Sequence, residues 1–118
     1  MLGSAPDELL KRFRIMVIEF HDLDLMFSRF AFNIIRPVFE KLTTFHNVVH
    51  IHPNNCSRLT TRGALSVPSV MEFTFYRKDR PLNAPTSPLP FPHPLDADCL
   101  PGRPPLVLPD CWWPPRAH

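Results

Sequence analysis

The chain has 118 residues, of which 13 are basic and 11 acidic, and its formal net charge at neutral pH is +2. This length indicates one domain at most. The two charge types are intermixed and form no basic stripe, so the composition gives no sign of nucleic-acid binding, and every apolar run is too short to span a bilayer.

The cysteines bear on the compartment. Cys56, Cys99 and Cys111 are an odd number and lack the Cys-x-x-Cys spacing of zinc and redox sites. The N-terminal residues do not resemble a hydrophobic leader. We therefore expect reduced thiols in a cytoplasmic protein.

The first predicted elements are a short helix and a strand. Ser4 is the expected N-cap, Pro6 and Asp7 suit the first turn, and residues 8–12 would form a short surface helix. Residues 13–20 are almost continuously apolar, which favours a strand covered on both faces, as in parallel sheets.

A helical period follows. Apolar residues recur at steps of three and four from Leu23 to Leu42, which predicts a helix with one apolar face. We expect this Phe-rich stripe to pack in the core and Asp22 to be the N-cap. Pro37 offers no amide hydrogen to the carbonyl of Asn33, so the sequence predicts either a kink or two abutting helices.

Two further strands are predicted after the helix. Residues 47–52 are rich in Val and Ile, and residues 70–77 alternate apolar with polar side chains. Residues 53–68 are read as a connection. The order strand, helix, strand, loop, strand predicts an α/β fold with a parallel crossover and then an antiparallel return.

The C-terminal part has a different composition. Residues 79–118 hold twelve of the sixteen prolines, which excludes a helix or a central strand. Apolar residues such as Trp112 and Trp113 interrupt the prolines, whereas disordered segments are poor in aromatics. We expect an extended strap that lies on an apolar groove of this chain or of a neighbour.

Polar residues end two of the predicted strands, in the segments Glu19-Phe20-His21 and His50-Ile51-His52-Pro53-Asn54-Asn55. Side chains alternate along a strand, so the members of each pair of polar residues share a face. If the two strands are parallel and the third lies between them, both ends meet at one rim, where Glu72 enters. Open α/β sheets bind ligands at that rim.

Three interpretations of this cluster stay open. Glu19, His21 and His52 could be acid/base groups of an active site, because histidine titrates near neutrality. They could instead bind a metal, or be structural groups that satisfy one another. Arg58 and Arg62 in the connection could hold an anionic group, whereas His46, His93 and His118 are expected to be solvent-exposed.

Glycine is scarce, which bears on cofactor binding. A nucleotide site on such a sheet needs a Gly-rich turn that follows a strand and opens a helix. The glycines are Gly3, Gly63 and Gly102, and none has that position. The sequence therefore contains no recognisable nucleotide site.

Three ordered segments carry a family resemblance: Arg14-Ile15-Met16-Val17-Ile18-Glu19-Phe20-His21, Asn47-Val48-Val49-His50-Ile51-His52-Pro53-Asn54-Asn55 and Pro68-Ser69-Val70-Met71-Glu72-Phe73-Thr74-Phe75. Together they resemble the C-terminal half of FkbM-type methyltransferases, whose tail the Pro-rich end also resembles. The resemblance implies part of a class I, Rossmann-like, S-adenosylmethionine-dependent methyltransferase sheet over residues 1–79, with residues 80–118 as the tail. Its strands five, six and seven would be Phe13–Phe20, Asn47–His52 and Val70–Arg77, with strand seven antiparallel between the other two.

The resemblance also implies a division of roles. The family's cofactor-binding elements precede the part that this chain resembles, so we expect a fragment that is inactive alone and binds no cofactor or metal. The implied catalytic residues are Glu19, His21 and His52, and the implied substrate-binding residues are His50, Asn54, Asn55 and Glu72. The expected partner is a small-molecule or glycan-type methyl acceptor, and an exposed sheet edge could also cause association.

Two alternatives belong to other classes of protein. The chain could be a stand-alone interaction module that uses Trp112 and Trp113 of the Pro-rich tail. It could also be a small metal-dependent enzyme built on the histidine cluster.

Overall fold

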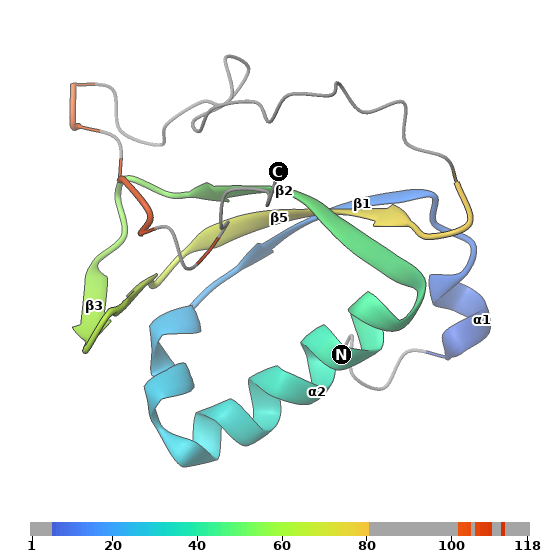
Figure 1. The fold of residues 1–118 in the computed structure, drawn as a ribbon, viewed down its shortest axis with the longest axis horizontal. Coiled ribbons are helices and arrows are strands. Elements are labelled where there is room, and N and C mark those ends of the chain that lie inside the picture. The colour runs from blue at the N-terminus through green and yellow to red at the C-terminus, as the bar shows by residue number, and fades with distance from the viewer. Residues whose placement is uncertain (1–5, 81–101, 105, 110–111, 113–118) are drawn as a thin grey trace, which may run out of the picture.

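The computed structural model describes residues 6–80, 102–104, 106–109 and 112, and their helices and strands form two layers (Figure 1). In chain order the elements are α1 (Asp7–Leu10), β1 (Ile15–Phe20), the 3-10 helix η2 (Leu23–Phe27), α2 (Arg29–Phe45), β2 (His46–Pro53), β3 (Leu59–Arg62), β4 (Leu65–Pro68) and β5 (Met71–Arg77). The long helix α2 lies along one face of a sheet, and a β3–β4 hairpin extends at one end. Within the described part of the chain, no helix combines the length and apolar character needed to cross a membrane.

The main sheet has three strands in the order β1-β5-β2. The central strand β5 is antiparallel to both neighbours, so β1 and β2 run parallel to each other and α2 connects them. The sequence pattern predicted two parallel strands followed by an antiparallel one, and the family resemblance implied that the antiparallel strand lies between the other two. The strand bounds differ from the predicted ones by one or two residues.

The two faces of the sheet are covered unequally. The face toward α2 carries most of the core, whose buried apolar residues are Leu10, Leu23, Leu42, Ile51, Val67, Met71, Phe73 and Phe75. On the opposite face Ile15 and Val17 are 49% and 58% exposed. The prediction that residues 13–20 are covered on both faces was wrong, because the helix between the parallel strands covers one face and these two side chains on the other face are exposed.

The helical segment breaks earlier than expected. Ser28, with extended backbone angles, separates η2 from α2, whereas Pro37 lies inside the continuous helix α2. Asp22 does precede η2, but its side chain makes no capping hydrogen bond and its backbone is left-handed, with φ of 57°. The break therefore follows the change of helix type at Ser28, and the missing amide of Pro37 does not divide the helix.

The N-terminal helix is shorter than predicted. It covers Asp7–Leu10, and Pro6 is the N-cap instead of a residue of the first turn. Ser4, the predicted N-cap, lies outside the described residues. Leu10 is buried, so this turn of helix contributes to the core.

The predicted connection over residues 53–68 contains a hairpin that the sequence reading missed. Strands β3 and β4 pair antiparallel, with Arg62 opposite Leu65. Gly63 occupies the turn with φ of 59°, a conformation that glycine adopts without steric cost. The backbone amide of Ser69 donates to Arg58 O, and that of Leu23 donates to Ser69 O, so the hairpin is tied to η2.

Two described residues of the Pro-rich part lie on the core. Leu108 and Trp112 pack against it, and Trp112 Nε1 donates a hydrogen bond to Ser66 O at 2.7 Å. These contacts are those expected of a strap on a groove of its own chain. Trp113 lies outside the described residues.

Candidate functional site

The strand register brings the two polar segments together. Glu19 on β1 and His52 on β2 both lie opposite Glu72 on β5, so these three residues form one line across the sheet, here called the polar row. The row crosses the sheet where β1 and β2 end, which is the rim that the sequence predicted. His50 lies opposite Thr74, two residue pairs further from the rim.

His21 extends the polar row beyond the end of β1. Its Nε2 lies 2.7 Å from Glu19 Oε1, and the two side chains are 66% and 46% exposed. At this exposure an ion pair contributes about 0–1 kcal/mol, so the contact orients the imidazole more than it stabilises the fold. The left-handed Asp22 then turns the chain away from the sheet.

The polar row places two like charges opposite each other, which lowers the stability of the fold. Glu19 and Glu72 are both acidic and face each other directly across the β1–β5 pair. Like charges in that position are destabilising, by amounts on the order of 0.2–1 kcal/mol. His21 and His52 stand at the two ends of the acidic pair, and both ring nitrogens of His52 are buried. Imidazole and carboxylate groups are the usual proton donors and acceptors of active sites, and of the two histidines His21 is exposed at the rim.

Asn54 and Asn55 shape the turn that follows β2. The side-chain oxygen of Asn54 accepts hydrogen bonds from the backbone amide and the thiol of Cys56, at 2.9 and 2.7 Å. Asn55 is buried, and its side-chain amide donates to Arg103 O at 3.2 Å. Both amides thus make contacts within the chain that fix the backbone beside the polar row.

Arg58 contacts a buried carboxylate. Its Nε donates to Asp24 Oδ2 at 2.8 Å, and Thr60 Oγ1 donates to the same oxygen at 2.9 Å. Burial raises the pKa of Asp24, but the hydrogen bonds from Arg58 and Thr60 and the charge of Arg58 outweigh this, so the net pKa is lowered. The hydrogen bond to Asp24 in turn raises the pKa of Arg58.

The loop arginines therefore have structural contacts. Arg58 holds the hairpin to η2 through Asp24, and the guanidinium of Arg62 lies over the Phe27 ring, 5.6 Å from its centroid. Neither contact joins these arginines to the polar row.

The sequence analysis predicted that His46 is exposed, and this prediction was wrong. It is fully buried where α2 passes directly into β2, and its Nε2 lies 2.8 Å from Phe13 O. A carbonyl oxygen can only accept, so Nε2 carries the proton. His46 thereby joins the start of β2 to the segment before β1. His93 and His118 lie outside the described residues.

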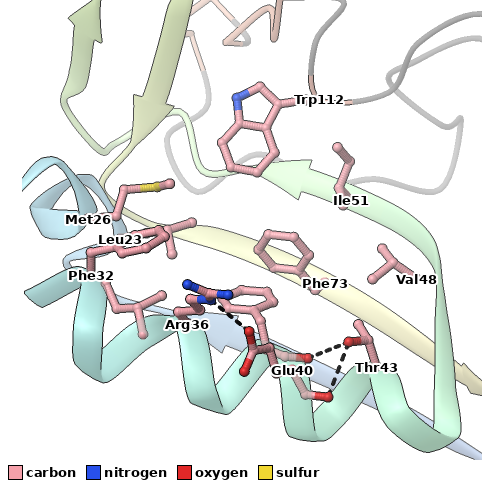
Figure 2. Close-up of a pocket in the computed structure, with 12 residues that line it drawn as sticks. Leu23, Met26, Phe32, Arg36, Glu40, Thr43, Val48, Ile51, Phe73 and Trp112 are labelled. Carbon is pink, nitrogen blue, oxygen red and sulfur yellow. Dashed lines mark hydrogen bonds and ion pairs between the residues drawn. The ribbon is translucent and has the colours of Figure 1, made fainter.

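A cavity of about 470 Å³ lies on the other side of the sheet from the polar row (Figure 2). Residues of β2 and β5 form one wall and residues of α2 the opposite wall, and residues of η2 and Trp112 complete the lining. Its lining residues are Leu23, Met26, Phe32, Ile35, Arg36, Phe39, Glu40, Thr43, Val48, Ile51, Phe73 and Trp112. The sequence analysis assigned to the core an apolar stripe that includes Phe30 and Ile34, and for these two side chains it was wrong, because they are 78% and 53% exposed. The cavity is lined instead by other apolar residues of α2, namely Phe32, Ile35 and Phe39. The i, i+3 and i+4 spacing identifies an apolar face but cannot tell whether that face meets another element along its whole length.

Among the described residues, no group of three or more His, Cys, Asp or Glu side chains could hold a metal ion. Comparisons with protein-family models, with curated proteins and with solved structures found no match for this chain. What the chain does must therefore be argued from its own residues.

Proposed function

We propose that this chain forms the substrate-side half of an S-adenosylmethionine-dependent methyltransferase cleft, of the FkbM type that its sequence resembles. The observation that supports this best is the strand order β1-β5-β2 with the polar row at its rim. An antiparallel strand between two parallel ones is the arrangement that the resemblance implies for the end of a class I methyltransferase sheet. The compartment proposed is the cytoplasm.

The polar row provides the acceptor side of the reaction. His21 or His52 would take the proton from the hydroxyl or amine that becomes methylated, since imidazole is basic enough to do so near neutral pH. Glu19 orients His21 through the 2.7 Å contact. Glu72 and His50 would hydrogen-bond the acceptor, and Asn54 and Asn55 would position the adjoining turn.

The described residues do not fit the cofactor. Gly63 lies in the turn of the β3–β4 hairpin and opens no helix, and Gly102 belongs to the Pro-rich part. Neither provides the close backbone approach at a helix N-terminus that a nucleoside site on a sheet requires. We therefore assign no cofactor-binding residue in this chain and propose that it is inactive alone.

Titration calorimetry with S-adenosylmethionine tests this proposal. The 118-residue chain is expected to give no stoichiometric binding heat. Joined to its in-frame upstream coding sequence, which should supply a Gly-rich loop, it is expected to bind one equivalent. Tight one-to-one binding by the 118 residues alone, or an upstream sequence without such a loop, would contradict the proposal.

The rival function, an interaction module that captures a partner through Trp112 and Trp113, has less support. The Trp112 indole already donates to Ser66 O and lies beside Phe73, with ring centroids 6.3 Å apart. A folded monomer that lost a partner on substitution of Trp113, with Trp112 intact, would favour this rival.

A further inference from the structure

A cavity lies between α2 and the sheet. Helix α2 runs into β2 without an intervening loop, and Leu42, close to this junction, is its buried residue. Toward its N-terminal end the helix carries exposed apolar side chains, with Phe30 at 78% and Phe32 at 37% exposed. The α2 residues that line the cavity run from Phe32 to Thr43, so this space of about 470 Å³ extends along most of the helix.

The walls of this space are apolar and rich in aromatic rings. Phe39 and Phe73 meet edge to face, with centroids 5.1 Å apart, and Trp112 follows beyond Phe73 (Figure 2). Val48 and Ile51 complete the sheet side. Cavities of roughly 300–1,000 Å³ with mostly apolar walls are the usual form of small-molecule sites.

The polar groups that line the cavity are already bonded within the protein. Arg36 Nε lies 2.7 Å from Glu40 Oε1, and Thr43 Oγ1 donates to Phe39 O at 2.7 Å. The Trp112 N–H is used by Ser66 O. The one cation and one anion of the lining are thus paired with each other, so the cavity offers a charged ligand no unpaired counter-charge, whereas its apolar walls favour an uncharged one.

From the volume, the aromatic walls and this charge balance we propose that the cavity is a binding site for an uncharged aromatic small molecule. Its ring system would pack between α2 and the sheet, against Phe39, Phe73 and Trp112, where edge-to-face and offset-stacked contacts are available. The site uses Phe73, whereas the polar row uses its neighbour Glu72, whose side chain points to the opposite face. The proposal therefore does not depend on methyl transfer.

A matched pair of fluorescent probes tests the proposal. N-Phenyl-1-naphthylamine is uncharged, and 8-anilinonaphthalene-1-sulfonate has the same rings plus a sulfonate. The full chain is expected to bind the uncharged probe saturably, with one site, and the sulfonate at least tenfold more weakly. Equal affinity for the two probes, or no saturable binding of the uncharged one, would overturn the proposal.

Two phenylalanines of α2 provide a matched control. Phe32→Ala removes part of the cavity wall and is expected to weaken binding of the uncharged probe about tenfold. Phe30→Ala removes the same side chain outside the cavity and should leave the affinity unchanged. Val48→Phe adds volume inside the cavity from the sheet side and should also weaken binding, which keeps the test valid if Phe32→Ala fails to fold. Equal effects of Phe30→Ala and Phe32→Ala would refute the location.

Discussion

Replacement of Asp24 by alanine is predicted to be one of the most destabilising changes to a charged residue in the described part of the chain. The Asp24 side chain is 5% exposed, and its Oδ2 accepts hydrogen bonds from Arg58 Nε and Thr60 Oγ1 at 2.8 and 2.9 Å. Hydrogen bonds to a charged group contribute about 1.5–3 kcal/mol each. These three residues connect η2 to the hairpin, so their loss separates two parts of the fold.

The net magnitude is smaller than the sum of the bonds. Arg58 is 65% exposed and returns to water at little cost, and alanine removes the penalty of burying a carboxylate. We therefore expect a loss of about 2 kcal/mol in the free energy of unfolding, with the Thr60 hydroxyl left without its acceptor. For a folded part of this size, that lowers Tm by about 8–16 °C.

Thermal unfolding followed by circular dichroism provides the assay, with Glu40→Ala as the matched control. The Arg36–Glu40 pair also spans 2.7 Å, but both side chains are more than 60% exposed, so its loss should cost at most about 0.5 kcal/mol. A double-mutant cycle with Arg58→Ala should give a coupling energy of about 1 kcal/mol or more. If Asp24→Ala lowered Tm no more than Glu40→Ala, the assignment of Arg58 to structure would be refuted.

Three further predictions concern pH, the sheet edge and the tail. Because the pKa of Asp24 is lowered in the folded chain, its contribution to stability is present above the usual carboxyl value of 3.8 and is lost as the pH falls through the lower folded value. Tm should therefore fall more steeply in acid for the native chain than for Asp24→Asn, and parallel Tm curves would contradict this. Val17→Lys places a charge on the exposed face of the edge strand β1 and should reduce self-association measured by sedimentation velocity. Ile34→Lys, at a similarly exposed position of α2, should not reduce it. Equal effects of the two substitutions would exclude the strand edge as the cause. Trp112→Ala should lower the free energy of unfolding by about 2 kcal/mol, because it removes both the packing on Phe73 and the hydrogen bond to Ser66. An unchanged midpoint of chemical denaturation would show that Trp112 does not pack there.

The sequence was sufficient to predict the main sheet. Period-two alternation in residues 70–77 and apolar runs ending in polar residues fixed three strands, and the helix between the first two required them to be parallel. The alternation of side chains along each strand also allowed Glu19, His52 and Glu72 to lie on the same face of the sheet. Their alignment in one row needed only the additional assumption that the third strand lies in the middle.

Other features depend on contacts that no local pattern records. The hairpin was missed because β3 and β4 are only four residues each, although Gly63 between β-branched segments is a turn signal that could have indicated it. The burial of His46 depends on a carbonyl 33 positions earlier in the chain. Similarly, the partner of Arg58 is Asp24, 34 positions earlier in the chain.

Disulfide trapping across the polar row tests the central claim most directly, namely that Glu19 of the first polar segment lies opposite Glu72 of the central strand at the rim. Arg77 N donates to Arg14 O, so by strand alternation Glu19 and Glu72 form a non-hydrogen-bonded pair, in which opposite Cβ atoms lie about 4.5–5.5 Å apart. In a chain whose native cysteines are replaced by serine, Glu19→Cys with Glu72→Cys should oxidise to an intramolecular disulfide, because that separation is close to what the bond requires. Val17→Cys with Glu72→Cys, a diagonal pair at about 7–8 Å, should oxidise much more slowly. Equal rates for the two pairs, or no disulfide in the first, would contradict the register and with it the site.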